Sequence, residues 1–168
     1  MKPNISFLFI LLIFFTPFAN GGQGGAMQLS SPAFQSQQLI PRKYTCQGED
    51  INPALRIAGI PAETKSLALI VDDPDAPGGN WDHWVVYNIP TVTEIKENSV
   101  PGEEGHNNFG RTSYGGPCPP SGVHRYFFKI YALDAELNFF KTPHKKDVLK
   151  AMEGHILDQT ELIGLYKK

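Results

Sequence analysis

The sequence contains only two cysteines, has almost no net charge and has no apolar run long enough to cross a bilayer as a helix. A formal net charge of −2 leaves no basic excess, so we expect no nucleic-acid partner. Neither cysteine is part of a CxxC pair, which argues against a zinc or dithiol redox motif. The signatures GxSxG and HExxH are also missing, so the common hydrolase classes gain no support.

The longest apolar run covers residues 5–15, only 11 residues, whereas a membrane-spanning helix needs about 20. Lys2 precedes this run and small residues follow it at Ala19 and Gly21, which predicts a signal peptide over residues 1–21, cleaved somewhere between 19 and 26. A Gly-rich linker (22–26) and one domain (27–168) follow. The alternative is a buried N-terminal strand or helix. We therefore expect an exported protein, periplasmic or secreted, with no transmembrane anchor in its mature form.

Export changes the interpretation of the two cysteines. In an oxidising compartment a lone pair usually closes, which predicts a disulfide between Cys46 and Cys118. A loop of this size would add roughly 4 kcal/mol of stability in the chain-entropy model. The alternative is two buried free thiols.

Frequent Gly and Pro residues and short apolar runs favour a mainly β protein over a helical bundle. Only the C-terminal region has helical periodicity, with Thr142 expected as N-cap and Pro143 as the first helical residue. The expected strands are residues 27–34, 42–47, 55–60, 66–72, 81–89, 123–133 and 160–166, with a strand or turn within 92–101, a loop at 102–114 and a helix at 143–157.

The stretch 72–90 contains the first group of candidate site residues. Asp73 and Asp75 lie at the end of one predicted strand, and His83 lies at the start of the next. Strand alternation places His83 on one face with Val85 and Tyr87. A hairpin would bring the carboxylates and the histidine together, at a strand end where binding sites are common. The alternative is ordinary turn chemistry beside a packed histidine.

A second group follows the rigid turn at residues 115–122. His124 and Tyr126 share a strand face with Phe128 and Ile130, immediately after this turn. The free amides of Gly115, Gly116 and Cys118 either point at an anion or simply belong to a stiff turn. His106, in the loop at 102–114, is expected to be solvated.

These motifs, DPDAP at 73–77, HW at 83–84, GPCPP at 116–120 and GVHRY at 122–126, resemble the phosphatidylethanolamine-binding protein family, in particular its bacterial Raf-kinase-inhibitor-like branch. The resemblance covers residues 27–168. It implies a β-sandwich of two antiparallel sheets with Greek-key connections and a C-terminal helix. It also implies a pocket for phosphate, acetate or a phosphoethanolamine head group. The implied pocket residues are Asp73, His83, His124 and Tyr126, with a wall at Gly116 to Pro120 and Trp81 near the rim.

The residues also indicate how such a pocket would bind an anion. A carboxylate close to a histidine favours the imidazolium form, so Asp73 is expected to raise the pKa of His83 or His124. The protonated rings and Tyr126 would then donate to the ligand. Asp75 would cap the loop or meet an ammonium group.

We therefore expect a non-enzymatic protein that binds a small anionic ligand or phospholipid head group without a cofactor. The alternative is an exported regulator of a protein partner, such as a protease or kinase inhibitor or a secreted effector. Catalysis by the Asp, His and Tyr residues and divalent metal binding are weaker alternatives, because their spacing matches no standard site. Export makes a Raf-type role doubtful.

Overall fold

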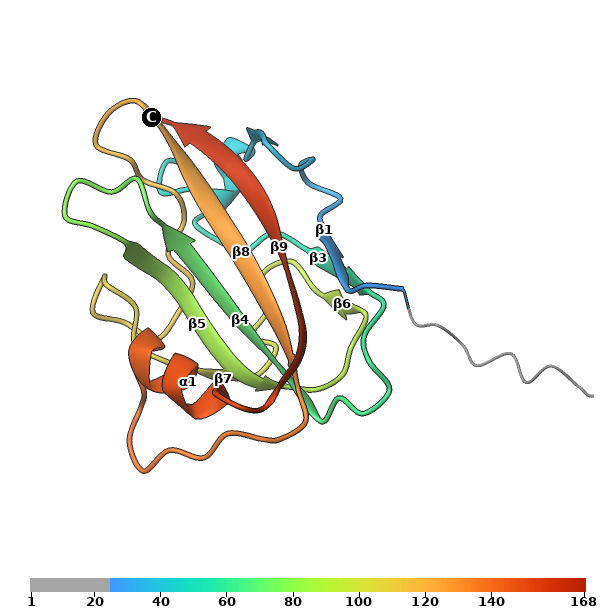
Figure 1. The fold of residues 1–168 in the computed structure, drawn as a ribbon. Coiled ribbons are helices and arrows are strands. Elements are labelled where there is room, and N and C mark those ends of the chain that lie inside the picture. The colour runs from blue at the N-terminus through green and yellow to red at the C-terminus, as the bar shows by residue number, and fades with distance from the viewer. Residues whose placement is uncertain (1–24) are drawn as a thin grey trace, which may run out of the picture.

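The computed structural model describes residues 25–168, so the expected signal peptide and most of the linker lie outside the described residues. Two β-sheets form the structure (Figure 1). The smaller sheet has the order β1-β3-β6, and the larger has the order β2-β9-β8-β4-β5-β7. The strands are β1 (Gln28–Ser30), β2 (Gln38–Leu39), β3 (Leu55–Ala58), β4 (Ser66–Asp73), β5 (Trp81–Ile89), β6 (Glu94–Ile95), β7 (Glu103–Glu104), β8 (Val123–Leu133) and β9 (Ile156–Lys167).

The larger sheet contains a Greek key, because its strands β4, β5, β7 and β8 take the spatial order β8-β4-β5-β7. Its pairs are antiparallel except β2 with β9, which is parallel. The predicted mainly-β sandwich is thus confirmed, and both sheets are open. The bounds predicted for β5 and β8 agree with the structure.

Strand β4 is buried along its whole length because both faces of the larger sheet are covered at this strand. Between the sheets, Leu67, Leu69 and Val71 join the main core with Phe128 and Ile130. On the opposite face, a second cluster lies beneath the helix and contains Ala68, Ile70, Val85, Tyr87, Val148 and Met152. Burial on both faces explains why the β4 sequence is a continuous apolar run, without alternation.

The helix is shorter than predicted. Helix α1 spans Lys145–Met152, and its N-cap is His144, which forms a capping box with Asp147. Gly154 follows with a φ of 80°, a left-handed conformation that ends helices, and β9 then starts at Ile156 instead of residue 160. The predicted N-cap at Thr142 and the predicted end at 157 are therefore wrong.

Residues 42–47 are also not a strand. Arg42–Tyr44 form a short 3-10 helix, η1, because the backbone amide and the hydroxyl of Thr45 both donate to the carbonyl of Arg42. In the predicted loop at 102–114, strand β7 pairs with β5, and β6 is the only strand within 92–101.

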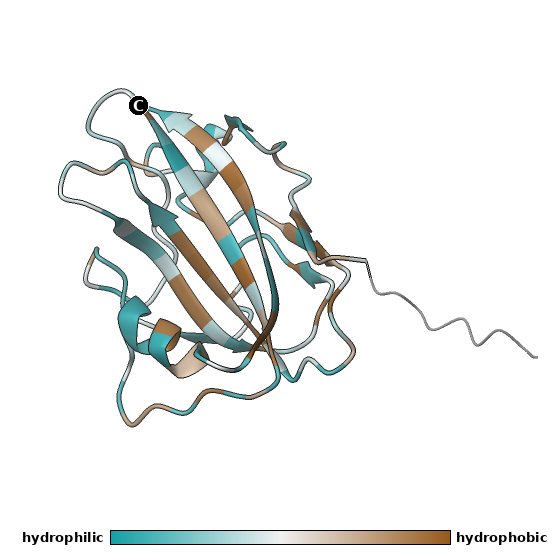
Figure 2. Ribbon diagram, in the orientation of Figure 1, coloured by the Kyte–Doolittle hydropathy of each residue, from teal (hydrophilic) through white to brown (hydrophobic). Residues whose placement is uncertain are grey.

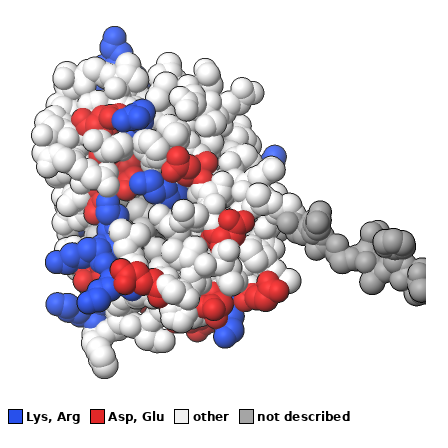
Figure 3. Space-filling model, viewed as in Figure 1, with Lys and Arg blue, Asp and Glu red and all other residues white. Residues whose placement is uncertain are grey.

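Two polar residues of β5, Asp82 and His83, lie at its start. Figure 2 shows this strand as hydrophilic near the β4–β5 connection, hydrophobic in its middle and hydrophilic again close to its end. Figure 3 shows acidic and basic side chains interspersed over the same view, with basic ones gathered over α1. In residues 25–168 no helix has the length and hydropathy needed to cross a membrane.

Candidate functional site

A β-bulge at the start of β5 sets the direction of His83. Val71 pairs with Trp84, but the next residue, Asp72, pairs with Asp82, so His83 is an extra residue in the ladder. The bulge interrupts the alternation of faces. His83 therefore packs between the sheets, with its ring 5.2 Å from the ring of Tyr126 in a T-shaped arrangement. The prediction that it shares a face with Val85 and Tyr87 is wrong, since those side chains lie under α1.

Asp73 and His124 form a buried pair. The ring Nδ1 of His124 lies 2.7 Å from Oδ2 of Asp73, and both residues are almost fully buried. The other carboxylate oxygen accepts the backbone amide of Asp75 at 2.8 Å. His124 and Tyr126 point to the same side of β8, as the alternation predicted. Both oxygens of Asp73 thus have protein partners that fix its orientation.

A cavity of about 240 Å³ opens beside these residues, at the end of the sheet where the β4–β5 connection and the chain entering β8 meet. Its lining residues are Asp73, Ala76, Pro77, Gly78, Trp81, His83, Phe109, Cys118, Pro119 and Pro120. Of the predicted site residues, Asp73, Trp81, His83 and Pro120 line the cavity. His124 and Tyr126 contact these lining residues from β8.

Phe109 belongs to the site but was not predicted. Its ring makes edge contacts with Trp81, at 5.5 Å between centroids, and with His83, at 5.2 Å. Trp81 and Phe109 are 36% and 41% exposed, so they form an aromatic rim at the mouth. An aromatic residue within the polar, Gly-rich segment 102–114 was the signal that could have identified it.

The protonation of His83 follows from its surroundings. Nδ1 lies 2.6 Å from the carbonyl oxygen of Gly115, which can only accept, so Nδ1 carries the hydrogen. Burial lowers the pKa of His83 below its ordinary value, although the Gly115 carbonyl and the charge of Asp73 act in the opposite direction. Asp73 thus raises the pKa of His83 as expected, but the net shift is downward because desolvation outweighs the carboxylate.

Tyr126 contributes a buried hydroxyl that makes no well-formed hydrogen bond among the described residues, although Asp73 and the backbone amide of Cys118 lie close to it. Burial raises the pKa of this phenol, and the charge of Asp73 adds to the rise. Tyr126 is therefore a neutral phenol over the physiological range. An unpaired buried hydroxyl costs about 1–3 kcal/mol, so a group able to accept from it would be favoured here.

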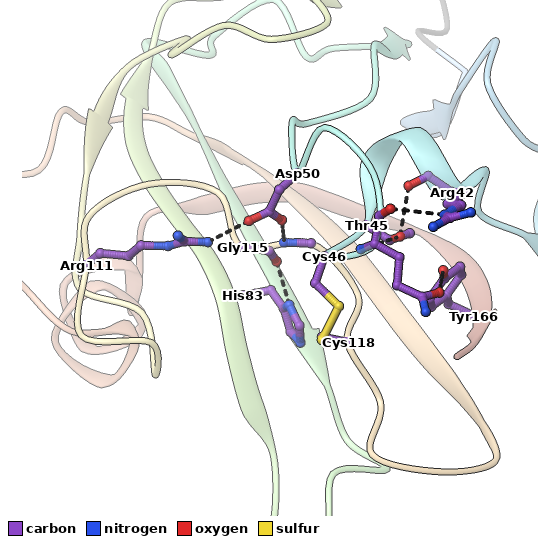
Figure 4. The surroundings of a disulfide bond; sticks show 11 residues. Arg42, Thr45, Cys46, Asp50, His83, Arg111, Gly115, Cys118 and Tyr166 are labelled. Carbon is purple, nitrogen blue, oxygen red and sulfur yellow. Dashed lines mark hydrogen bonds and ion pairs between the residues drawn. A yellow bond between two sulfur atoms is a disulfide. The ribbon is translucent and has the colours of Figure 1, made fainter.

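The wall of the cavity is fixed from behind (Figure 4). Cys46 and Cys118 form a disulfide, and the amide of Cys46 donates to the carbonyl of Pro117 at 3.2 Å. The amide of Gly115 donates to the carbonyl of His83, and that of Gly116 donates to Asp50. These two amides therefore do not form an anion-binding nest, and Gly116 supports the wall without lining the cavity.

Asp75 ties the β4–β5 connection to β8. Its carboxylate accepts hydrogen bonds from the backbone amide, Nε and a terminal nitrogen of Arg125 at 2.7–2.9 Å. These bonds lower the pKa of Asp75 to about 2. Of the two predicted roles, the structure shows the one that restrains the loop. His106 lies away from the cavity, with its ring 5.1 Å from that of His144.

Four hollows in the described residues are larger, at about 380, 440, 380 and 250 Å³. The first lies between Asp50, Trp84 and Arg111, and the second lies along the exposed side of β8 and β9. None of the four is lined by a buried histidine, whereas the smaller cavity contacts one directly and a second through Asp73. The smaller cavity is therefore the better candidate site, since buried titratable groups cluster at functional sites.

Comparison with known proteins identifies the family. The family model described as phosphatidylethanolamine-binding protein matches residues 30–167. A UPF0098 protein of Methanothermobacter thermautotrophicus is 51% identical over 150 residues, which are 84% of this chain and 99% of the relative. A UPF0098 protein of Pyrococcus horikoshii is 46% identical over 181 aligned positions, which cover 100% of this chain and 91% of the relative.

Two solved structures agree with this match. A phosphatidylethanolamine-binding protein homologue from Chlamydia trachomatis superposes with a TM-score of 0.82 at 45% identity, covering 85% of this chain and 98% of the other. Escherichia coli YbcL superposes with a TM-score of 0.78 at 30% identity, covering 84% and 98%. The chain belongs to the phosphatidylethanolamine-binding protein family.

Proposed function

We propose that the protein is a non-catalytic binding protein for a small anionic group, either inorganic phosphate or a phosphoethanolamine head group. The observation that carries the proposal is the state of the two buried histidines. His83 and His124 both use Nδ1 for a protein partner, the Gly115 carbonyl and Asp73 respectively. Each ring therefore keeps Nε2 as the atom available to a ligand.

Binding would proceed by proton uptake. In its neutral form the Nε2 of His83 accepts a hydrogen bond, for example from a protonated phosphate oxygen, and in the imidazolium form it donates. An arriving anion favours the imidazolium, whose hydrogen bonds to phosphate oxygens are charge-assisted and strong. The Tyr126 hydroxyl, which has no partner among the described residues, supplies a neutral donor beside His83.

The size and walls of the cavity support a small ligand. About 240 Å³ is less than the volume of typical drug-binding pockets, which start at roughly 300 Å³. The prolines at 119 and 120 and the rings of Trp81 and Phe109 are largely apolar, so they limit water access and strengthen each polar contact. The aromatic rim also provides a surface for the organic part of a phosphoester.

The family's name, phosphatidylethanolamine-binding protein, supports a ligand with a phosphoethanolamine group. We also propose that the protein works outside the cytoplasm. A disulfide that joins Cys46 to Cys118 behind the cavity persists best in an oxidising compartment, which agrees with the signal peptide expected from the sequence.

The test is an NMR titration of the disulfide-bonded protein with inorganic phosphate and, separately, with phosphoethanolamine. We expect saturable shifts at His83, His124 and the Pro119–Pro120 wall. His124→Ala should abolish them. His155→Ala is a matched control, because His155 also pairs with a carboxylate, Asp134, at 2.8 Å, but is about half exposed and away from the cavity. Absence of shifts at millimolar ligand in the wild type would overturn the proposal.

A second candidate is a protein-binding regulator, favoured by the exposed aromatic rim of Trp81 and Phe109. Aromatic side chains are enriched at the centres of protein interfaces. A pull-down from the organism's extracellular or periplasmic fraction, with wild type and Phe109→Ala, tests it. Capture that is saturable, lost in Phe109→Ala and unaffected by phosphate would favour the regulator over the anion-binding protein.

A further inference from the structure

One peptide group connects Asp50 to His83. The carbonyl of Gly115 accepts from Nδ1 of His83 at 2.6 Å, and the N–H of Gly116 donates to Oδ1 of Asp50 at 2.6 Å. Both groups belong to the same peptide bond. No cis peptide occurs in the described residues, and the C=O and N–H of a trans peptide point in opposite directions. Asp50, the peptide and the imidazole therefore form a continuous chain of hydrogen bonds (Figure 4).

The two bonds reinforce each other. A carboxylate that accepts from the N–H draws the peptide toward its charge-separated resonance form, with more negative charge on the carbonyl oxygen. A more negative oxygen is a better acceptor for the Nδ1 hydrogen of His83. The carboxylate of Asp50 thus acts on the ring without touching it.

Asp50 is held in place for this contact. Its backbone has a φ of 57°, a left-handed conformation that is uncommon for a residue other than glycine. Its second oxygen, Oδ2, accepts from Arg111 at 3.0 Å, and the same guanidinium nitrogen donates to the carbonyl of Tyr114 at 3.1 Å. A strained conformation persists where surrounding contacts fix it, and such sites often serve function.

Gly116 completes the arrangement through close packing. A Cβ at this position would lie 2.5 Å from the carbonyl oxygen of Tyr44 and 2.7 Å from Oδ1 of Asp50. The absence of a side chain allows the carboxylate to approach the amide at hydrogen-bond distance. A larger residue would push Asp50 away from the peptide.

We infer that Asp50 is a positioning residue of the cavity, which acts through the Gly115–Gly116 peptide to hold His83 as the Nδ1–H tautomer and so keeps Nε2 for the ligand. The role in binding rests on the proposed function, whereas the tautomer is a property of the unliganded protein. The sequence motifs do not identify Asp50 as a site residue, because its contact with the site runs through the backbone.

Other charged and titratable groups also act on His83. Asp72 and Asp73 on β4 raise its pKa by their charge, as Asp50 does, while burial lowers it. Tyr126 on β8 packs against the ring, and Asp73 also pairs with His124. Phe109, on the remaining side, is not titratable. A test of Asp50 must therefore distinguish the effect of its hydrogen bond to the Gly116 amide from the effect of its charge on His83.

The experiment is ¹⁵N NMR of histidine-labelled, unliganded, full-length protein in four forms: wild type, Asp50→Asn, Asp50→Ala and Glu49→Gln. Asparagine tolerates a left-handed φ and its side-chain oxygen can still accept from Gly116. Asp50→Asn should therefore retain the Nδ1–H tautomer but lower the pKa of His83, and Asp50→Ala should give a mixture of tautomers. Glu49→Gln removes a neighbouring exposed charge and should change neither.

Phosphate titrations of the same four proteins measure the effect of each substitution on ligand affinity. Asp50→Ala should bind phosphate about fivefold more weakly, the loss expected for one ordinary hydrogen bond, with Glu49→Gln unchanged. An unaltered His83 tautomer in a folded Asp50→Ala protein, checked by thermal melting, would overturn the inference. If wild type fails to bind phosphate, the proposed function fails, while the tautomer data still decide the role of Asp50.

Discussion

Asp72 and Asp73 are consecutive in β4, and their carboxylates lie on opposite faces of the larger sheet. Asp73 points between the sheets and pairs with His124, whereas Asp72 points toward α1 and accepts from Lys129 at 2.8 Å and from Lys145 at 3.2 Å. One carboxylate thus belongs to the candidate site and the other attaches the helix to the sheet. Strand alternation produces this division from two identical residues.

The first prediction concerns Asp72. Burial acts to raise the pKa of this carboxyl, but hydrogen bonds from Lys129 and Asn80 outweigh it and the pKa lies below its ordinary value. Its pairing therefore stabilises the protein fully above about pH 4, the unfolded pKa, and the contribution is lost as the pH falls through the folded pKa. We expect Asp72→Asn to lower the free energy of unfolding by about 2 kcal/mol at pH 7. This loss is smaller than for a fully buried pair, because Lys129 is partly exposed.

Urea denaturation at pH 7 and at pH 2.5 measures this effect. The free energies of unfolding of wild type and Asp72→Asn should converge at the lower pH. Asp134→Asn is the control: its half-exposed pair with His155 should contribute less than about 1 kcal/mol. A difference between wild type and Asp72→Asn that stays constant with pH would show that the charge of Asp72 is not what stabilises the fold.

The second prediction concerns the pH dependence of anion binding. Burial lowers the pKa of His83, so the ring is neutral in the unliganded protein at neutral pH and an anion must recruit a proton. Affinity for sulfate, whose own charge is constant between pH 5 and 8, should rise as the pH falls. His83→Asn should remove most of this dependence, since its amide can still donate to Gly115 but does not titrate. Isothermal titration calorimetry at several pH values measures the sulfate affinity of wild type and His83→Asn. An equal dependence of affinity on pH in the two proteins would contradict the prediction.

The sequence predicted the side-chain direction of a site residue correctly only where the strand alternates regularly with a period of two. His124 and Tyr126 follow a regular strand, and alternation placed both side chains correctly. His83 sits at a bulge, whose extra residue depends on pairing with β4, so no period within β5 could place it. Phe109 reaches the cavity from a loop, and its position depends on tertiary contacts with Trp81 that have no local signature.

The same distinction applies to the fold. Val123–Leu133 has strong β propensity and its bounds were predicted correctly, whereas the helix ended early at a glycine. Gly154 lies inside the predicted helix, but its positive φ marks the turn into β9. Residues 42–47 have strand-like composition, yet the hydrogen bonds of Thr45 to Arg42 make a tight turn there. In both segments, contacts that form only in the folded chain determine the structure, and local propensity does not.

The third prediction concerns the disulfide. Cys46 and Cys118 are 72 residues apart, so the chain-entropy model assigns the bond about 4 kcal/mol of stability. Reduction of the wild type should lower the free energy of unfolding, measured by urea denaturation, by this amount. It should also shift the NMR signals of His83, because Gly115 lies three residues from Cys118. A protein with both cysteines changed to serine should not respond to reductant. Identical unfolding curves for oxidised and reduced wild type would rule out this contribution.

The fourth prediction compares substitutions at two buried tyrosines. The hydroxyl of Tyr126 has no partner among the described residues, so Tyr126→Phe should leave stability unchanged or raise it by about 1 kcal/mol. The hydroxyl of Tyr114 donates to the carbonyl of Tyr44 at 3.0 Å, so Tyr114→Phe should lose about 1 kcal/mol by breaking a buried bond.

Ligand binding should show the reverse order in these two variants. Tyr126→Phe should weaken phosphate binding about fivefold, because it removes a donor beside His83, and Tyr114→Phe should leave affinity unchanged. Thermal melts and phosphate titrations on both proteins measure the two quantities independently. If Tyr126→Phe destabilised the protein and bound phosphate normally, the hydroxyl would have a structural partner and would not belong to the site. A group that is positioned for binding is expected to lower stability in the unliganded protein and to increase affinity for the ligand, and the Tyr126 hydroxyl should show both effects.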